Sequence, residues 1–316
     1  MEKAEFVLSA DDASRRLDRV IRKFLTALPL SRIYAAIRKG NVRVNGRRVS
    51  SDYKTAIGDV LTIDRQLLDR SHLSERNSGT GKNSGAACNG RKQKAVPLPV
   101  LLETDDLLII NKPAGIAVHG AYSVQSILAE RLSDSQHTAS LSFTPGPLHR
   151  LDKNTTGALC FSRTLNGAQW FSQCLRMNMM GKYYLGVVKG CLPSRLIRTV
   201  SGGQEAVTRC FPISYNESLD SSLMLFNLIT GKKHQIRKHM QETGHPLAGD
   251  KRYGGGRTPA GCTGYLLHAW RLSFPERRLE GLPTYIEAPL SSCMDSYLSR
   301  FFPDWKNAPE IRDLVR

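Results

Sequence analysis

Apolar residues in the N-terminal region first follow a helical spacing. The stretch "SADDASRRLDRVIRKFLTAL" opens with a Ser9-x-x-Asp12 capping-box pattern. One face of the helix predicted to follow carries Leu17, Val20, Ile21, Phe24, Leu25 and Leu28. Pro29 should end this helix, and Ser31 should cap a second short helix, "SRIYAAIRK", that stops at a left-handed Gly40. The pattern predicts two short helices with a shared apolar side.

The spacing then changes to that of strands. "VRVNGRRV" alternates Val42 and Val44 before an Asn-Gly turn, which is the strongest short-range signal for a β-hairpin. "GDVLTI" adds another strand after a Gly-Asp turn. We therefore expect a small sheet directly after the helix pair.

Together, these elements resemble the S4-type RNA-binding domain. The match runs from about Ala13 to Ile63 and rests on "RRLDRVI", "LSRIYAAIRKGNVRVNG" and "GDVLTI". The resemblance implies that structured RNA binds to the helix pair and hairpin. It places five basic residues near phosphates: Arg32, Arg38, Lys39, Arg43 and Arg47. Any one of them alone would be an ordinary surface charge, so their value lies in their clustering.

Residues 65–99 break the apolar pattern. This segment is rich in Gly, Ser, Asn and Lys and has no sustained apolar period after Leu73, which is typical of a flexible, basic linker. Its "SGTGKNSG" lacks the G-x-x-x-x-G-K-[ST] spacing of a phosphate-binding loop. We predict an S4-like domain over residues 1–64, a linker over 65–99 and a second domain over 100–316.

The second domain contains many short apolar segments. "VLLETDDLLIINKPAGIAVH" indicates strands joined by a tight turn at "KPAG", and "GALCFSRT", "KYYLGVVKG" and "SSLMLFNLI" predict further strands. Between them, "NGAQWFSQCLRMNM" has helical spacing. Strands and helices do not alternate regularly, so we expect a mixed sheet with a minority of helices, an α+β fold.

Charge narrows the choice of partner. The chain has 316 residues and a formal net charge of +17, and residues 1–96 alone hold 20 Lys and Arg against 10 Asp and Glu. Such a field attracts phosphodiester backbones without reading sequence, although solubility alone would also explain some positive charge. The composition therefore favours RNA as partner.

Other features exclude several classes of protein. The chain has no run of about 18 apolar residues and no apolar signal-peptide core near its start, so we expect a cytoplasmic protein without membrane contact. Seven cysteines form no CxxC pair, which favours scattered reduced thiols over a disulfide framework or structural zinc. No sustained heptad appears, and we expect a monomer.

One loop concentrates reactive side chains. In "PLHRLDKNTTGALCFSRT", Asp152 follows His149 and Arg150 and precedes a strand. A carboxylate beside cations and hydroxyl groups is available as acceptor, base or nucleophile near neutral pH. On chemistry alone, an aspartate that binds its own loop backbone is equally admissible.

"HRLDKNTTG" closely resembles the active-site motif of the RluA-type pseudouridine synthases, which combine an S4-like domain with a catalytic domain in this order. The resemblance runs from about Leu101 to Phe274 and includes "INKPAGIAVH", "GKYYLGVVKG", "ITGKKHQIRKH", "GHPLAGDKRYGG" and "LLHAWRLSF". It implies a mixed, mainly antiparallel sheet flanked by helices, isomerisation of uridine to pseudouridine, and no cofactor or metal.

The resemblance also assigns roles to residues. Asp152 matches the essential aspartate, Tyr184 the active-site tyrosine and Arg237 the basic partner of the aspartate. Arg150 matches the arginine that fills the stack when the target base is flipped out. Further contacts with RNA are expected from His149, Lys232, Lys233, His234 and Gln235.

Each role has an alternative. Tyr184 could be a packed strand residue, although alternation gives that part to Tyr183, and Arg237 could be a phosphate contact. The spacing of His234, His239 and His245 does not fit a zinc site. Three positions depart from the usual pattern of the family: Thr156, Lys232 and Lys233. They put phosphate contacts and substrate preference in doubt.

Two classes of function remain open. The first is an RNA-modifying enzyme acting on large-subunit (23S-type) ribosomal RNA, with transfer RNA as the nearer alternative substrate. The second is a catalytically silent RNA-binding or ribosome-assembly protein. The trio Asp152, Tyr184 and Arg237 favours the enzyme, because RNA affinity alone does not require it.

Overall fold

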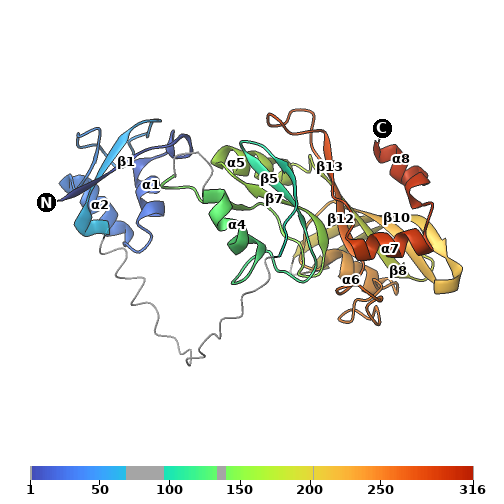
Figure 1. Ribbon diagram of the computed structural model, residues 1–316. Coiled ribbons are helices and arrows are strands. Elements are labelled where there is room, and N and C mark those ends of the chain that lie inside the picture. Colours follow the sequence, from blue (N-terminus) through green and yellow to red (C-terminus); the bar gives the residue numbers. More distant parts are fainter. Residues whose placement is uncertain (1, 69–95, 134–139, 202, 316) are drawn as a thin grey trace, which may run out of the picture. The chain divides into compact units, whose positions relative to one another are not determined.

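The computed structural model describes residues 2–68, 96–133, 140–201 and 203–315. The chain divides into two compact units, Met1–Ala95 with Arg131–Pro145 and Val96–Glu130 with Gly146–Arg316. The sequence predicts residues 131–145 to be part of the second domain, whereas the structure assigns them to the first unit. Most of the predicted linker, residues 69–95, lies outside the described residues. Figure 1 shows the elements of each unit.

The first unit has the helix pair and small sheet expected of an S4-like domain. Its elements are β1 (Lys3–Val7), η1 (Ala10–Asp12), α1 (Leu17–Phe24), α2 (Leu30–Lys39), β2 (Val42–Val44) and β3 (Val60–Asp64). The sheet order is β1-β3-β2, and both pairings are antiparallel. Apolar residues of both helices and the sheet form one buried core, including Leu17, Ile21, Ile33, Val42 and Leu61. The predicted apolar faces therefore meet.

The start of the first helix differs from the prediction. The Ser9–Asp12 capping box closes only the single turn η1, and α1 begins at Leu17. Between them, Ser14 adopts a left-handed φ of 56° and donates its backbone N–H to Thr55. Leu17 N–H likewise donates to Tyr53. Long-range backbone pairing thus replaces the first helical turns.

Two further local predictions need correction. The N-cap of α2 is Pro29, which offers no side-chain cap, and Ser31 lies inside the helix. The Asn45-Gly46 turn forms with both residues at positive φ, but no returning strand follows it. Instead β2 pairs with β3, because the Asn45 side chain accepts a hydrogen bond from Val60 N–H at 2.8 Å. Gly40 ends α2 in the left-handed conformation, as predicted.

The segment that returns to the first unit is held by a buried carboxylate. Asp12 accepts hydrogen bonds from Ser140 Oγ at 2.7 Å, Leu141 N–H at 3.2 Å, and Ser142 N–H and Oγ at 2.9 and 2.6 Å. Arg15 donates to Ser142 Oγ at 2.7 Å. Residues 140–142 are therefore an integral part of the S4-like unit. We call them the strap.

The second unit is built on one large sheet. Its strands are β4 (Val100–Glu103), β5 (Leu107–Lys112), β6 (Gly146–Pro147), β7 (Thr156–Ser162), β8 (Gly181–Lys189), β9 (Arg195–Ser201), β10 (Gln204–Asn216), β11 (Ser221–Leu228), β12 (Leu267–Ser273) and β13 (Tyr285–Glu287). The order along the sheet is β4-β5-β7-β12-β8-β11-β10-β9. Among the described strands, only β7 and β12 pair in parallel. The predicted mixed, mainly antiparallel sheet is confirmed.

Helices cover both faces of this sheet. The helices of the chain after β5 are α4 (Val124–Ser133), α5 (Leu165–Arg176), α6 (Gln235–Glu242), α7 (Ser292–Phe301) and α8 (Pro309–Val315), with short turns η2 (Glu217–Leu219) and η3 (Trp305–Asn307). Side chains of α5 pack on β5, β7 and β12. Side chains of α7, η3 and α8 pack on the face that holds Leu185 and Trp270. The α+β fold predicted from the sequence is confirmed.

Two sequence expectations fail in this unit. The apolar run after the "KPAG" turn forms no strand, and β5 pairs with β4 and β7 instead. The prediction of reduced thiols throughout is wrong for one pair, since Cys262 and Cys293 form a disulfide with Cα atoms 5.3 Å apart. The two residues are 31 positions apart, and spacing alone does not reveal that the loop before β12 meets the start of α7.

Candidate active site

Backbone contacts fix the loop that carries Asp152. Lys112 is fully buried at the end of β5, and its ammonium donates to the carbonyls of Pro113, Lys153 and Thr155 at 2.8, 3.0 and 2.8 Å. Burial lowers the pKa of Lys112 to about 8, although the charge of Asp152 opposes this shift. Three carbonyls on one ammonium join the "KPAG" turn to the loop and define its shape.

The exit of the loop into β7 is equally constrained. His268 donates through Nε2 to the Ala288 carbonyl at 3.0 Å, so its Nδ1 accepts from the Thr156 hydroxyl at 2.7 Å. Gly157 has a φ of 111°, and a Cβ there would lie 2.2 Å from the Ala269 carbonyl oxygen of β12. Only glycine allows β7 to approach β12 this closely. Asp152 is thus anchored on rigid strands.

A buried ion-pair network leads to the carboxylate. Arg237, on the first turn of α6, donates through Nε and Nη2 to both oxygens of Asp250 at 2.7 and 2.9 Å. Its Nη1 donates to Asp152 Oδ2 at 3.3 Å. Burial lowers the pKa of Arg237, but Asp250, Tyr265 and Asp152 more than offset this and raise it overall. Asp250 therefore holds the guanidinium so that one N–H group points at Asp152.

Aromatic rings complete the setting of Arg237. Its guanidinium lies 4.8 Å from the ring centre of Tyr253 and 4.3 Å from that of Tyr265. Tyr265 also shares a hydrogen bond of 3.1 Å with the Thr155 hydroxyl in the loop that carries Asp152. Burial raises the pKa of Tyr265 to about 12, so the phenol stays neutral. Tyr265 thereby connects the arginine to the loop.

Tyr184 lies on β8 and faces the same space as Asp152. It is 7% exposed, and burial followed by the charge of Asp152 raises its pKa. The neighbouring Tyr183 packs on the opposite face of the sheet, against the core that includes Met294. The alternation predicted for the two tyrosines is therefore present. A neutral buried phenol can contact a base through its ring and donate a hydrogen bond.

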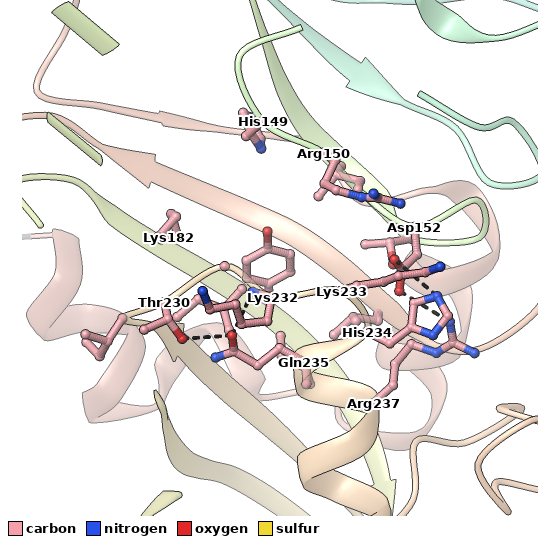
Figure 2. A pocket seen from close by; sticks show the side chains of 18 of the residues that line it. His149, Arg150, Asp152, Lys182, Thr230, Lys232, Lys233, His234, Gln235 and Arg237 are labelled. Atoms are coloured by element: carbon pink, nitrogen blue, oxygen red, sulfur yellow. Dashed lines mark hydrogen bonds and ion pairs between the residues drawn. The ribbon is translucent and has the colours of Figure 1, made fainter. Parts of the chain in front are cut away.

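A cavity of about 460 Å³ opens beside these residues. Its walls come from the Asp152 loop, the end of α5, β8, the end of β11 and the start of α6. Figure 2 shows Arg150, Asp152, His234 and Arg237 near one end of the cavity and Lys182 and Thr230 near the other. The volume lies within the range of small-molecule sites, so a single flipped nucleotide is of suitable size.

The basic residues around the cavity differ in exposure. Arg150, Lys232 and Lys233 are exposed, and Lys232 donates to Gln204 Oε1 at 2.7 Å. Lys182 is partly buried, and this burial lowers its pKa. Among the described residues, we find no hydrogen bond or ion pair of its ammonium group. The exposed arginine and the lysines are well placed to bind phosphates, and the arginine can also fill the position that a flipped base leaves empty.

Two residues that the sequence predicts to contact RNA have partners within the protein. His149 accepts a hydrogen bond from Cys160 N–H at 3.0 Å and stacks on Phe171, and burial lowers its pKa to about 4, with a smaller effect from Lys182. Gln235 is buried and binds Val207, Thr208, Thr230 and the N–H of Lys232. Both residues shape the walls of the cavity through protein contacts.

His234 lies directly beside Asp152. Its Nε2 is 3.6 Å from Asp152 Oδ1, and its Nδ1 is 2.9 Å from the Tyr253 hydroxyl. Burial lowers the pKa of His234, with Asp152 acting in the opposite direction. The sequence placed this histidine among RNA contacts, whereas the structure brings it to the second oxygen of the carboxylate.

In the first unit, the basic residues assigned to RNA lie on α2, β2 and the turn that follows. Arg32, Arg38, Lys39 and Arg47 are exposed. Arg43 is partly buried and donates to the carbonyls of Gly40 and Gly46 at 3.2 and 3.3 Å. Four of the five are therefore free to meet a phosphate, whereas Arg43 also holds the turn.

The described residues contain no group of three or more His, Cys, Asp or Glu side chains arranged for a metal ion. Within the same residues, no helix is long and apolar enough to cross a membrane.

Sequence reasoning missed several residues of the site. Asp250, Tyr253, Tyr265, Lys112 and Lys182 were not assigned roles, although all of them except Tyr265 lie inside quoted motifs. The carboxylate in "GHPLAGDKRYGG" was the available signal, because a buried arginine requires a counter-charge. Its partner, 13 positions earlier on α6, could not be read from spacing alone.

Comparison with known proteins identifies the family of the chain. The family model described as RNA pseudouridylate synthase matches residues 106–242, and the S4 domain model matches residues 15–61. The chain is 32% identical to ribosomal large subunit pseudouridine synthase C of Escherichia coli (strain K12), over 95% of this chain and 96% of that protein. It is 30% identical to the protein of the same name from Vibrio vulnificus (strain CMCP6), over 91% and 93%.

A solved structure is also similar. Human RNA pseudouridylate synthase domain containing 4 superposes with a TM-score of 0.51 at 25% identity. The superposition covers 64% of this chain and 92% of that one.

Proposed function

Since the chain belongs to the RNA pseudouridylate synthase family and carries an S4 domain, we propose that it isomerises specific uridines in large-subunit ribosomal RNA, with Asp152 as the essential carboxylate. The observation that carries the proposal is the carboxylate at the cavity wall, held by Arg237, which Asp250 holds in turn. The curated relatives named above supply the class of RNA.

The reaction needs few groups. The bond from ribose C1′ to uracil N1 breaks, the detached uracil turns, and C5 bonds to C1′ while the hydrogen on C5 leaves and N1 gains one. No redox change occurs and no group is transferred to another molecule. Positioning and charge therefore account for most of the catalysis.

The residues fit these steps. Of the cavity-lining residues that the structure describes, only Asp152 has a carboxylate, and it acts on the flipped uridine as nucleophile or base. Arg237 keeps it oriented through a charge-assisted pair. Tyr184 supplies a neutral ring against which the uracil can turn. Arg150 occupies the space that the flipped base leaves, which offsets a loss of a few kcal/mol in stacking.

The S4-like unit supplies further affinity for RNA. Its exposed cluster of Arg32, Arg38, Lys39 and Arg47 suits phosphates of a structured RNA. We propose further that the protein acts as a monomer in the cytoplasm. Gel filtration and cell fractionation test these two points.

The direct test is a map of pseudouridine in ribosomal and transfer RNA from cells that lack the gene. The cells are complemented with the native chain or with Asp152→Asn, which keeps the side-chain size and removes the carboxylate. We expect large-subunit sites that depend on the native chain alone. If the dependent sites lie in transfer RNA, the proposed reaction stands but its substrate is transfer RNA. If the maps from the two strains are identical and no second synthase modifies the same sites, the protein is not an active synthase. The remaining function is then that of a catalytically silent RNA-binding protein.

A further inference from the structure

His234 has an unusual backbone conformation next to the candidate nucleophile. Its φ of 56° and ψ of 26° lie in the left-handed region, which few residues other than glycine adopt. It directly precedes α6, the helix that carries Arg237. Strained residues that persist in a rigid setting are often held there for function. This conformation places the ring between Asp152 and Tyr253.

The two neighbours of the ring determine which nitrogen carries the proton. Nε2 faces the carboxylate of Asp152, where a bare lone pair would be repelled. Nδ1 lies 2.9 Å from the Tyr253 hydroxyl, which can donate to it. A neutral ring with hydrogen on Nε2 satisfies both contacts at once. Tyr253 thus selects the tautomer that presents an N–H group to Asp152.

The result is a separate support for each oxygen of Asp152. Arg237 donates to Oδ2 at 3.3 Å, and His234 Nε2 approaches Oδ1 at 3.6 Å. Catalytic hydrogen bonds are often long in the free enzyme and shorten when substrate binds. Figure 2 shows both side chains pointing at the same carboxylate.

Other charges around the ring are consistent with a neutral histidine. His234 faces Asp152, Arg237, Arg252, Lys233 and the phenol of Tyr253. Three of these five are cations, and burial together with them lowers the pKa of His234 against the pull of Asp152. A neutral donor is what the geometry requires.

We propose that His234 is a positioning residue for Asp152, with its donor nitrogen fixed by Tyr253, rather than a contact with RNA. The proposal rests on the proposed function, since it assumes that Asp152 acts in the reaction. It assigns roles to two residues that bind no phosphate. Their loss should slow the chemical step and leave RNA binding intact.

Three substitutions separate the contacts of the ring. His234→Asn tolerates the left-handed backbone and can still reach Tyr253, but its shorter amide does not reach Asp152. His234→Gln can extend an N–H group to the position of Nε2. Tyr253→Phe keeps the ring beside Arg237 and removes only the hydroxyl. As matched control, Tyr215→Phe removes a hydroxyl that donates at 2.9 Å to Asp220 on the exposed surface.

The assay is tritium release from uridine labelled at C5 in unmodified large-subunit ribosomal RNA. We expect His234→Asn to lower kcat about 100-fold with KM within about threefold of wild type. His234→Gln should recover about tenfold of that loss, and Tyr253→Phe should lower kcat about tenfold. Tyr215→Phe should stay within about twofold of wild type.

Each failure has a distinct meaning. A wild-type chain that releases no tritium would contradict the proposed function itself. If Asp152→Asn loses activity but the His234 and Tyr253 variants keep the wild-type rate, the inference about His234 is wrong and the proposed function stands. A raised KM with unchanged kcat would make His234 an RNA contact. If a His234 variant does not fold, Tyr253→Phe decides the question, because its ring and packing are retained.

Discussion

Asp12 in the S4-like unit and Asp152 in the catalytic unit show two uses of the same side chain. Asp12 is completely buried and accepts hydrogen bonds from Ser9 and from the strap, all from neutral donors. Burial raises its pKa, but these bonds outweigh that effect and lower it. Asp152 is 14% exposed at a cavity and faces two basic side chains. Asp12 is saturated by short bonds from neutral donors and holds structure, whereas Asp152 has one long contact at each oxygen and lines a cavity, which leaves it able to act on a substrate.

The sharpest test of this contrast is Asp152→Asn. We expect kcat to fall about 10⁴-fold or more, because the amide is neither nucleophile nor base. The free energy of unfolding should change by less than about 1 kcal/mol, since the side chain is partly solvated and loses only long contacts. Tritium release and urea unfolding measure the two effects. If Asp152→Asn instead loses much stability and keeps part of its activity, Asp152 is a structural carboxylate like Asp12.

Asp250 provides the next test, because it supports Asp152 through Arg237. Asp250→Asn leaves a buried guanidinium without its bidentate partner, and breaking such a pair costs about 3 to 5 kcal/mol of stability. The rate should fall as well, since Arg237 is no longer held towards Asp152. Glu205→Gln, which removes an exposed ion pair with Arg198, is the control and should cost about 0.5 kcal/mol or less. Equal effects in the two variants would contradict the structural role of Asp250.

Local signals allowed part of this site to be predicted. The loop with Asp152, the strand with Tyr184 and the helix with Arg237 each carry a short motif, and the resemblance to a family joined them. The spacing of apolar residues likewise predicted the helix pair and most strands. Such features depend on residues a few positions apart, where pattern and propensity act.

The remaining parts depend on contacts between distant residues. The pairing of Arg237 with Asp250, the strap on Asp12 and the disulfide of Cys262 become visible only when the chain is folded. The break before α1 has the same cause, since Thr55 takes the N–H of Ser14. Sequence pattern carries no record of such pairings, so they limit what could be predicted.

His268 extends the comparison to histidines. Like Asp12, it is fully buried with neutral partners, and burial lowers its pKa from 6.5 to about 4. Between pH 6.5 and 4 the unfolded chain binds a proton here that the folded chain does not, so stability falls as the pH falls. The loss attributable to His268 should reach about 2.5 kcal/mol at pH 4.5. Urea unfolding of the wild type and of His268→Gln between pH 7 and 4.5 isolates this loss. If the unfolding free energies of the two proteins change in parallel with pH, the prediction is wrong.

Asp12→Asn gives the smallest effect and completes the comparison. The amide keeps the shape of the side chain but replaces an acceptor oxygen with an NH₂ group, which must face donors such as Ser142 N–H or the Ser140 hydroxyl. One unsatisfied buried donor costs about 2 kcal/mol, and the cost should fall on the S4-like unit. Amide hydrogen exchange at Leu141 and Ser142 should accelerate, while kcat at saturating RNA stays at the wild-type value. A fall in kcat without faster exchange would mean that Asp12 acts on the chemistry, and the division between structural and reactive carboxylates would not hold.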